Sequence, residues 1–324
     1  MNPAFSVIFL TTLIGAGQGL FLALMTAEAF SHMGALPAQD NAFYSNGSML
    51  SLGLLVAGLF ASFFHLGHPE RAWRSAAMWR TSGLSREVIA LPAFMGTVFV
   101  YGMLHYLDWN PTVFGIAALP ATDLTLLVGI IGVVLCFTLF ICTGMIYACL
   151  KFLQEWHTPL TLINYILFGM SSGFMLATAY AAEYNTEVTG LFGTWAIILT
   201  VMALITRGAS LMRNKRIKHR SSLKTAIGVR HSNIQQKSQG SMGGSFNTRE
   251  FFHGKGAMFV KSVKWIFLIL VFPLPLLLMS VGLSNDAAIL LTLAFAVQYV
   301  GLLAERWFFF AQANHPQNLY YQTI

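Results

Sequence analysis

The sequence predicts an all-α integral membrane protein with eight transmembrane helices. Of its 324 residues, 56% are apolar and only 10% are charged, whereas soluble domains contain about 25% charged residues. The apolar residues also form eight long runs. A helix needs about 20 residues to cross a bilayer, and backbone hydrogen bonds in lipid are satisfied only within helices or closed barrels.

The eight apolar runs define the predicted spans. In chain order they are Phe5–Phe30, Ser48–His65, Val88–Tyr106, Leu124–Leu150, Leu160–Ala181, Gly190–Met212, Val263–Leu283 and Ala287–Trp307. The first is interpreted as a span and not as a cleaved signal, because no basic region precedes it and further spans follow. The fourth holds all three cysteines, which we interpret as small apolar residues of a buried helix. Pro273 and Pro275 are expected to kink the seventh.

Two of these runs contain similar segments. Gly19–Leu24 in the first span resembles Gly173–Thr178 in the fifth. Since four spans return the chain to its starting side, two parallel four-helix halves are expected. Small residues are also common wherever helices touch in membranes, which is the alternative explanation of the similarity.

The charged residues lie on opposite sides of this arrangement. With eight spans, all 19 Lys and Arg residues fall in the connections 66–87, 151–159 and 213–262 or at span ends on the same side. The opposite connections hold acidic residues and no Lys or Arg. By the positive-inside rule, the basic connections and both termini are cytoplasmic. The net charge of +7 therefore indicates topology and attraction to anionic lipid or a partner, and not nucleic-acid binding.

The chain is expected to divide into three parts. Residues 1–212 form six spans, 213–262 a basic cytoplasmic loop, and 263–324 two spans and a cytoplasmic tail. The loop is rich in Gly, Ser, Gln and Asn, which is typical of a solvated linker. Its aromatic residues Phe246, Phe251 and Phe252 favour the alternative, a partner-docking segment that becomes ordered on assembly.

Two ionisable residues flank the connection 66–87. His65 ends the second predicted span and Glu87 precedes the third. Ionisable groups at this depth indicate function, and a His with a carboxylate can donate a hydrogen bond and protons to a quinone carbonyl. The structural alternative is helix capping, with Ser85 as the N-cap and Glu87 in the first turn.

The same region carries a family resemblance. His65-Leu66-Gly67-x-Pro69-x-Arg71-Ala72, followed by Ser82-Gly83-Leu84-Ser85-Arg86-Glu87, resembles a segment of the membrane anchor of dimethyl sulfoxide reductases. Trp156-x-Thr158-Pro159 and Glu305-Arg306-x-Phe308-Phe309-Phe310 are similar to later landmarks of that family. The resemblance therefore covers nearly the whole chain and is most specific at residues 60–90.

The resemblance implies an anchor subunit of the bacterial inner membrane. It implies eight helices, no haem, and a site for ubiquinone or menaquinone that uses His65 and Glu87. Arg71 and Trp73 of the same connection are further candidates for this site, with membrane topology and an interfacial aromatic belt as the alternative explanations. It also implies docking to a four-cluster iron–sulfur subunit, which connects to a molybdopterin catalytic subunit. The expected docking residues are Arg74, Arg80, Arg230, Phe246, Arg249 and Phe251.

The orientation narrows this interpretation. In dimethyl sulfoxide reductases the face with this His looks out of the cytoplasm, whereas the charges of this chain turn it inward. The basic segments Lys224–His231 and Gly243–Phe252 resemble those of anchors of cytoplasmically oriented sulfite dehydrogenases. The expected function is electron transfer from sulfite to quinone. The alternatives are the anchor of a related complex that oxidises quinol, a purely structural anchor, and a secondary transporter.

Other ionisable residues receive structural interpretations. His32 and His105 could pair as haem ligands, but both are expected to be interfacial residues at span ends. Glu28, near the end of the first span, is likewise expected at the interface.

Overall fold

The computed structural model describes residues 1–114, 122–184, 187–218, 222–231, 233–234 and 253–316. Within them, eight helices or helix pairs are long and apolar enough to cross a membrane, as the sequence predicts. They are α1 (Phe5–His32), α2 (Asn41–Phe63), α3 (Gly83–Tyr106), α4 (Leu124–Ala148), α5 (Pro159–Glu183), α6 (Val188–Lys215), α9 with α10 (Ala257–Val271 and Pro273–Ser284), and α11 (Ala288–Ala311).

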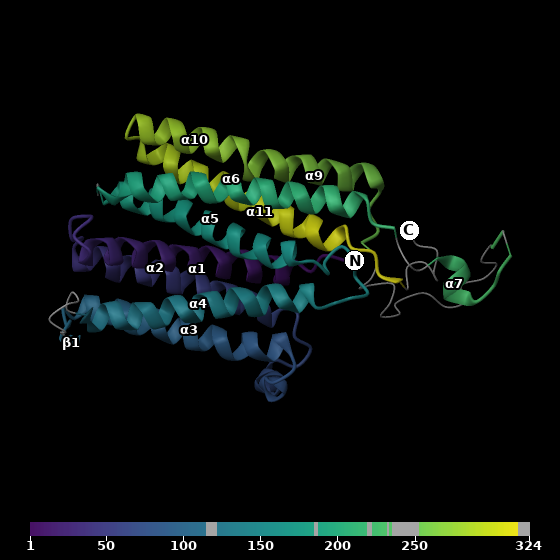
Figure 1. Ribbon diagram of the computed structural model, residues 1–324, viewed down its shortest axis with the longest axis horizontal. Coiled ribbons are helices and arrows are strands. Elements are labelled where there is room, and N and C mark those ends of the chain that lie inside the picture. Colours follow the sequence, from purple (N-terminus) through teal and green to yellow (C-terminus); the bar gives the residue numbers. More distant parts are fainter. Residues whose placement is uncertain (115–121, 185–186, 219–221, 232, 235–252, 317–324) are drawn as a thin grey trace.

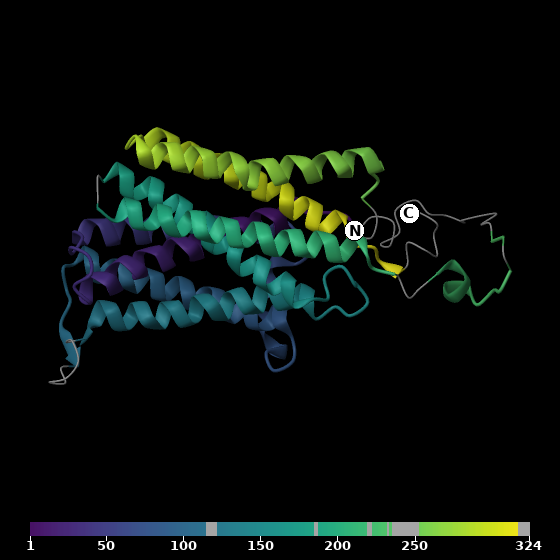
Figure 2. The same ribbon diagram turned by 45° about the horizontal axis from the view of Figure 1, so that its top comes forward.

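The spans lie side by side along the long axis of the molecule (Figures 1 and 2). We call one end of this bundle the basic end: it carries both termini and the connections 64–82, 149–158 and 216–256. The other end, the acidic end, carries the connections 33–40, 107–123, 184–187 and 285–287. Short elements lie in the connections: the 3-10 helix η1 (Pro69–Met78), α7 (Leu223–Ile227), and strands β1 (Thr112–Phe114) and β2 (Thr122–Asp123), which pair antiparallel.

Several helices begin before the apolar runs do. α2 begins at Asn41 instead of Ser48, and α3 at Gly83 instead of Val88. The predicted N-cap of α3 is wrong: the Ser82 hydroxyl accepts the Ser85 backbone N–H at 3.4 Å, and Ser85 itself is buried in the helix. The reason is that hydropathy detects only the part of a helix that lies in hydrocarbon, whereas backbone hydrogen bonding continues into polar turns.

The seventh span is interrupted at its prolines. α9 ends at Val271, Phe272 leaves the helical region with φ −113° and ψ −81°, and Pro273 begins α10. Proline lacks the N–H needed to continue the hydrogen-bond ladder, and its ring clashes with the preceding turn. The expected kink is therefore confirmed as a break.

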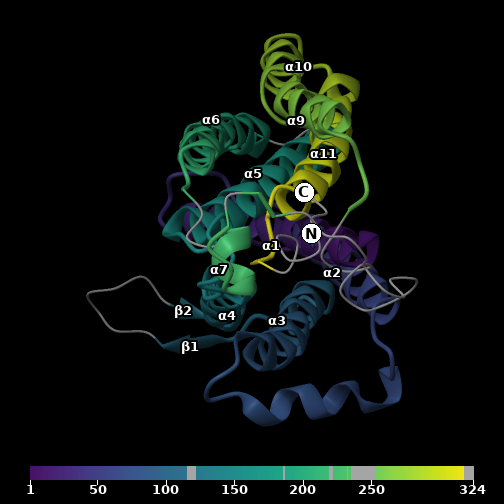
Figure 3. The ribbon, with the colours of Figure 1, turned by 90° about the vertical axis from the view of Figure 1, so that its right-hand side faces the viewer.

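The helices are arranged as two similar halves (Figure 3). In the first half, α1 packs on α2 and α4, and α3 packs on α2 and α4. In the second half, α5 packs on α6 and α11 in the same way, and the α9–α10 pair packs on α6 and α11. The contacts between the halves also correspond, because α4 packs on α5 as α11 packs on α1. This pattern supports the two four-helix halves that the sequence predicts.

The halves meet where α1 crosses α5. A Cβ atom added to Gly19 would lie 2.2 Å from the Gly169 carbonyl oxygen, and one added to Gly173 would lie 2.2 Å from the Gly19 backbone. No side chain fits between these two helices, so glycine is required for the close approach. Gly19 and Gly173 begin the two similar segments of the sequence.

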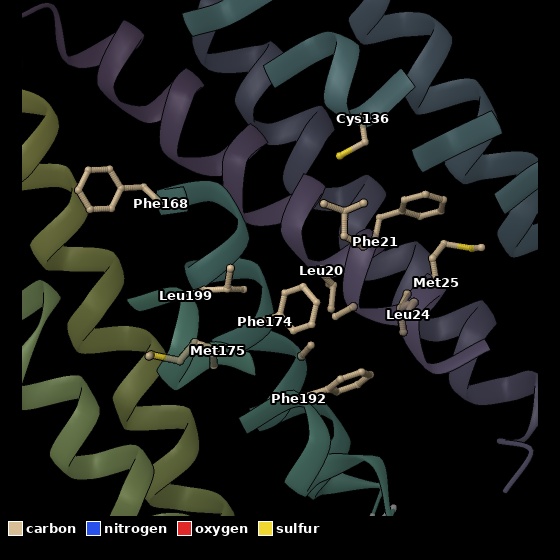
Figure 4. Close-up of a cluster of buried hydrophobic side chains, with 14 of the residues drawn as sticks. Leu20, Phe21, Leu24, Met25, Cys136, Phe168, Phe174, Met175, Phe192 and Leu199 are labelled. Carbon is tan, nitrogen blue, oxygen red and sulfur yellow. The ribbon is translucent and has the colours of Figure 1, made fainter. Parts of the chain in front are cut away.

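An apolar core surrounds this crossing on the side of the acidic end. Figure 4 shows Leu20, Phe21 and Leu24 of α1 beside Phe174 and Met175 of α5, all buried. Large apolar side chains also cover the outside of the bundle, for example Phe60, Ile205 and Leu277. An apolar exterior is what a lipid-facing surface requires.

Candidate functional site

Glu87 occupies a polar position near the basic end of α3. It is the fifth residue of that helix and not part of the first turn, so the capping interpretation of Glu87 does not hold. Its side chain is half-buried, and the Thr143 hydroxyl of α4 donates a 2.6 Å hydrogen bond to Oε1. Because α3 and α4 pack together, the first turns of α3 lie beside the last turns of α4.

Glu87 lines a narrow pocket at the meeting point of five helices. The other polar lining residues include Gln18 of α1, Thr143 of α4, Tyr165 of α5 and Arg306 of α11. The free volume of the pocket, which we call the Glu87 cavity, is about 20 Å³, and a site of about 10–15 Å³ suffices for one water molecule. The cavity has room for a water and not for a quinone ring.

The Arg306 side of this cavity belongs to a buried ion-pair cluster. Glu305 lies between two arginines: Oε1 is 2.8 Å from Nη2 of Arg207, and Oε2 is 3.1 Å from Nε of Arg306. The Arg306 guanidinium also lies 3.9 Å from the ring centre of Tyr165. A buried carboxylate with two guanidinium partners is compensated in charge, although Glu305 Oε2 and Arg207 Nη2 make no hydrogen bond of normal geometry among the described residues.

His65 lies apart from the Glu87 cavity. It follows the end of α2 by two residues, is exposed, and is not among the residues that line the cavity. The connection that carries it leads directly into α3 through η1.

The other predicted quinone and docking residues of this connection lie in or near η1. Arg71, Arg74 and Arg80 are exposed, and so are Trp73 (71%) and Trp79 (54%). The arginines lie over neighbouring rings, with Arg74 5.5 Å from the Trp73 ring centre and Arg80 5.4 Å from that of Trp79. The structure therefore places Arg71 and Trp73 on an outer surface of the basic end and not in the cavity.

The remaining predicted docking residues belong to the long basic connection. Arg230 is exposed. Phe246, Arg249, Phe251 and Phe252 lie outside the described residues.

The interfacial interpretation of Glu28 and His105 is wrong. They are only 4% and 6% exposed, respectively. Glu28 accepts 2.7 Å hydrogen bonds from the hydroxyls of Tyr101 and Thr125, and its Oε1 lies 3.6 Å from Nε2 of His105. Tyr44 stacks on His105 with 4.7 Å between ring centres. This cluster joins α1, α2, α3 and α4 at the acidic end, whereas His32 lies 3.9 Å from Asp123.

Comparison with known proteins identifies the family. A family model described as DMSO reductase anchor subunit (DmsC) matches residues 1–312. The chain belongs to this family of anchor subunits. The chain is also similar to a sulfite dehydrogenase subunit of Allochromatium vinosum, with 55% identity over 324 residues and full coverage of both chains. The predicted family resemblance is thus confirmed.

The later landmarks of the anchor family meet in the fold. Trp156 stacks on Phe309 with 5.2 Å between ring centres and 10° between ring planes, and its indole N–H donates to the Phe309 carbonyl at 3.0 Å. Thr158 caps α5 and Pro159 is its first residue, a favourable pair at a helix start. The contacts between these motifs therefore hold the connection 149–158 against the end of α11.

Sequence reasoning missed most of the residues around Glu87 in this anchor subunit. Gln18, Tyr165 and Arg306 come from three helices that are far apart in the chain. The available signals were a polar residue in the middle of the first span and the charged pair Glu305-Arg306 inside the last one. Neither signal shows which neighbouring helix these polar side chains face.

Proposed function

We propose that this anchor subunit holds a sulfite-oxidising complex at the membrane and passes its electrons to quinone beside Glu87 and His65. The observation that carries the proposal is the 55% identity, over the full length of both chains, to a subunit of a sulfite dehydrogenase. The position of Glu87 at the basic end, where a soluble partner would dock, agrees with it.

The overall reaction balances without a further reactant. Sulfite and water give sulfate, two protons and two electrons, and quinone takes up two electrons and two protons to become quinol. The oxidation belongs to a molybdopterin subunit, and the electrons reach the membrane through an iron–sulfur subunit. What this chain must supply is a place for quinone, hydrogen bonds to its carbonyl oxygens, and protons.

Glu87 suits the proton-donating role. Thr143 engages only Oε1 of its carboxyl group, which leaves Oε2 for a ligand. The side chain is half-buried, so it borders both the cavity and the space outside it. Since the cavity holds a water and not a ring, the quinone head group would approach Glu87 from the outer side, where the connection carrying His65 enters α3. A positioned carboxyl group or imidazole accelerates proton transfer by roughly 10²–10⁴-fold.

The charge distribution supports a cytoplasmic location of the partners and of both termini. Basic connections remain on the cytoplasmic side of membranes, and the basic end carries them here. Exposed Arg74 and Arg80, together with Arg230, Phe246, Arg249 and Phe251, would contact the iron–sulfur subunit. Ubiquinone and menaquinone both satisfy this scheme. Electrons delivered at the basic end need not cross the bilayer, so no haem is required.

Two substitutions test the site in the assembled complex. Glu87→Gln should lower quinone reduction by sulfite about 100-fold, as expected for loss of a proton-transfer group, and His65→Ala should also slow it. Sulfite oxidation with ferricyanide, an acceptor that does not need the membrane site, should be retained. If both variants reduced quinone at the wild-type rate, the chain would be a purely structural anchor.

Matched controls are available in the same chain. His68→Ala removes an exposed imidazole of the same connection, whose Nδ1 lies 3.0 Å from Oε1 of Glu70. Glu183→Gln changes an exposed carboxylate at the acidic end. Both control variants should reduce quinone at the wild-type rate.

A further inference from the structure

A second water-sized cavity lies next to the Glu87 cavity. Its free volume is about 10 Å³, and its lining includes Glu155, Tyr165, Arg207, Glu305 and Arg306. We call it the Glu155 cavity. Tyr165 and Arg306 line both cavities and so form the wall between them. Volumes of this size in a polar setting hold single water molecules.

The hydroxyl of Tyr165 is the unusual group in this wall. Its oxygen is buried, and it finds no hydrogen-bond partner of normal length and angle in the part of the chain that the structure describes. Buried hydroxyls nearly always have partners, and an ordered water is one such partner. The ring cannot easily turn away, because it stacks on Tyr147 at 5.5 Å and is covered by the Arg306 guanidinium.

Other polar groups of the Glu155 cavity bond to one another. Asn164 donates to Ser210 at 2.9 Å and accepts from Thr206 at 2.7 Å, while Thr161 donates to the Trp156 carbonyl at 2.7 Å. Glu305 has an arginine at each oxygen. Nε and Nη2 of Arg207 and Oε2 of Glu305 also lack a hydrogen bond of normal geometry among the described residues, but they line only the Glu155 cavity. The orphan hydroxyl of Tyr165, which borders both cavities, is therefore the group best placed to bind water on either side.

The far end of the Glu155 cavity reaches the basic end of the protein. Glu155 belongs to the connection 149–158, and its Oε1 accepts the backbone N–H of Asn314 at 3.4 Å. Its neighbours Lys151 and Phe152 are exposed. Glu155 itself is buried beneath this surface, at 6% exposure, and the polar groups run from it, past Tyr165, to Glu87.

We propose that Tyr165 joins the two cavities into a proton route from Glu155 to Glu87. The Tyr165 hydroxyl gives its proton to water in the Glu87 cavity and takes one from water in the Glu155 cavity, so one proton moves and the tyrosine is unchanged. Glu87 is reprotonated through the bundle while quinone occupies its outer side. Arg306, held by Glu305, positions the Tyr165 ring. This inference rests on the proposed quinone chemistry at Glu87.

The test compares two tyrosines, Tyr165 and Tyr44, whose buried hydroxyls both lack a hydrogen-bond partner of normal geometry among the described residues. Tyr165→Phe removes one oxygen and keeps the ring, so the complex should assemble normally. With sulfite as donor and a short-chain quinone as acceptor, kcat should fall about tenfold, less than for loss of Glu87 itself. The KM for quinone should not change, and the solvent deuterium isotope effect on kcat should rise. Tyr44→Phe, at the acidic end, lines neither cavity and should match the wild type in all three measurements.

The possible outcomes distinguish the proposed proton route from the proposed quinone site. Full turnover in Tyr165→Phe, with slow turnover in Glu87→Gln, overturns the route and leaves the quinone site. Full turnover in Glu87→Gln overturns both. Equal losses in Tyr165→Phe and Tyr44→Phe indicate a general effect of losing a buried hydroxyl and overturn the route. If Tyr165→Phe does not assemble, Glu155→Gln replaces it: this variant should also lower kcat at constant KM, and wild-type kcat would overturn the proposal.

Discussion

At the scale of single residues, burial separates two glutamates that look alike in the sequence. Glu28 and Glu87 both lie near the end of an apolar run. The predicted position of Glu87 near one end of its helix is correct, but the prediction for Glu28 is wrong, because that side chain is only 4% exposed. Hydropathy records how deep a residue lies along a helix. It does not show whether the residue faces lipid, water or another helix.

The buried Glu28 cluster makes a prediction about stability. Tyr101→Phe should destabilise the protein by about 1–3 kcal/mol, because it leaves the buried Glu28 carboxylate without one of its donors. The measurement is the apparent melting temperature of the purified complex in detergent. Tyr106→Phe is the matched control, since that residue lies on the same helix and is 72% exposed. Equal melting temperatures for Tyr101→Phe and Tyr106→Phe would show that the cluster contributes no stability.

At the scale of elements, long apolar helices can be predicted and polar ones cannot. All eight spans follow from hydropathy, and the break before Pro273 follows from proline chemistry. The helix η1 is not predicted from the sequence, because its polar, amphipathic segment is short and lacks the long apolar run of a transmembrane helix. The pairing of α1 with α5 is indicated by the Gly19 and Gly173 segments, although the sequence alone cannot show that these glycines touch.

The glycine crossing predicts a sharp difference between two identical substitutions. Gly173→Ala should destabilise the protein by about 3 kcal/mol, the upper range for overpacking, because the new Cβ would overlap the Gly19 backbone. Gly208→Ala in α6 should change stability by no more than about 1 kcal/mol, since an added Cβ there meets no atom within 4 Å. Thermal denaturation of both variants measures the difference. Similar melting temperatures would mean that α1 and α5 can separate at little cost.

At the scale of the whole molecule, the sequence predicts sidedness better than the site. Assigning the 19 basic residues to one end needs only the correct number of spans. The Glu87 cavity, in contrast, depends on how Gln18, Tyr165 and Arg306 are packed together from distant parts of the chain. Packing of this kind is not encoded in any local pattern.

The orientation can be measured on the full-length chain. Alkaline phosphatase inserted after Gln39 or Asn285, at the acidic end, should be active, because the enzyme needs an extracytoplasmic location. Inserted after Lys255, at the basic end, it should be inactive. Green fluorescent protein at the same three positions is the control and should give the opposite pattern. Phosphatase activity after Lys255 would mean that the orientation is the opposite one and that the proposed sulfite-oxidising partners lie outside the cytoplasm.

The crossing of α1 and α5 also closes the inner side of the Glu87 cavity. The lining of the Glu87 cavity extends inward to Gln18 of α1 and Ser172 of α5, and the next residues, Gly19 and Gly173, close the two helices on each other. Beyond that contact lie the apolar side chains of Leu20, Phe21 and Phe174. Under the proposed function, protons that reach Glu87 from the basic end meet an apolar barrier there. Under the proposed function, quinone reduction would neither dissipate the membrane potential nor contribute to it.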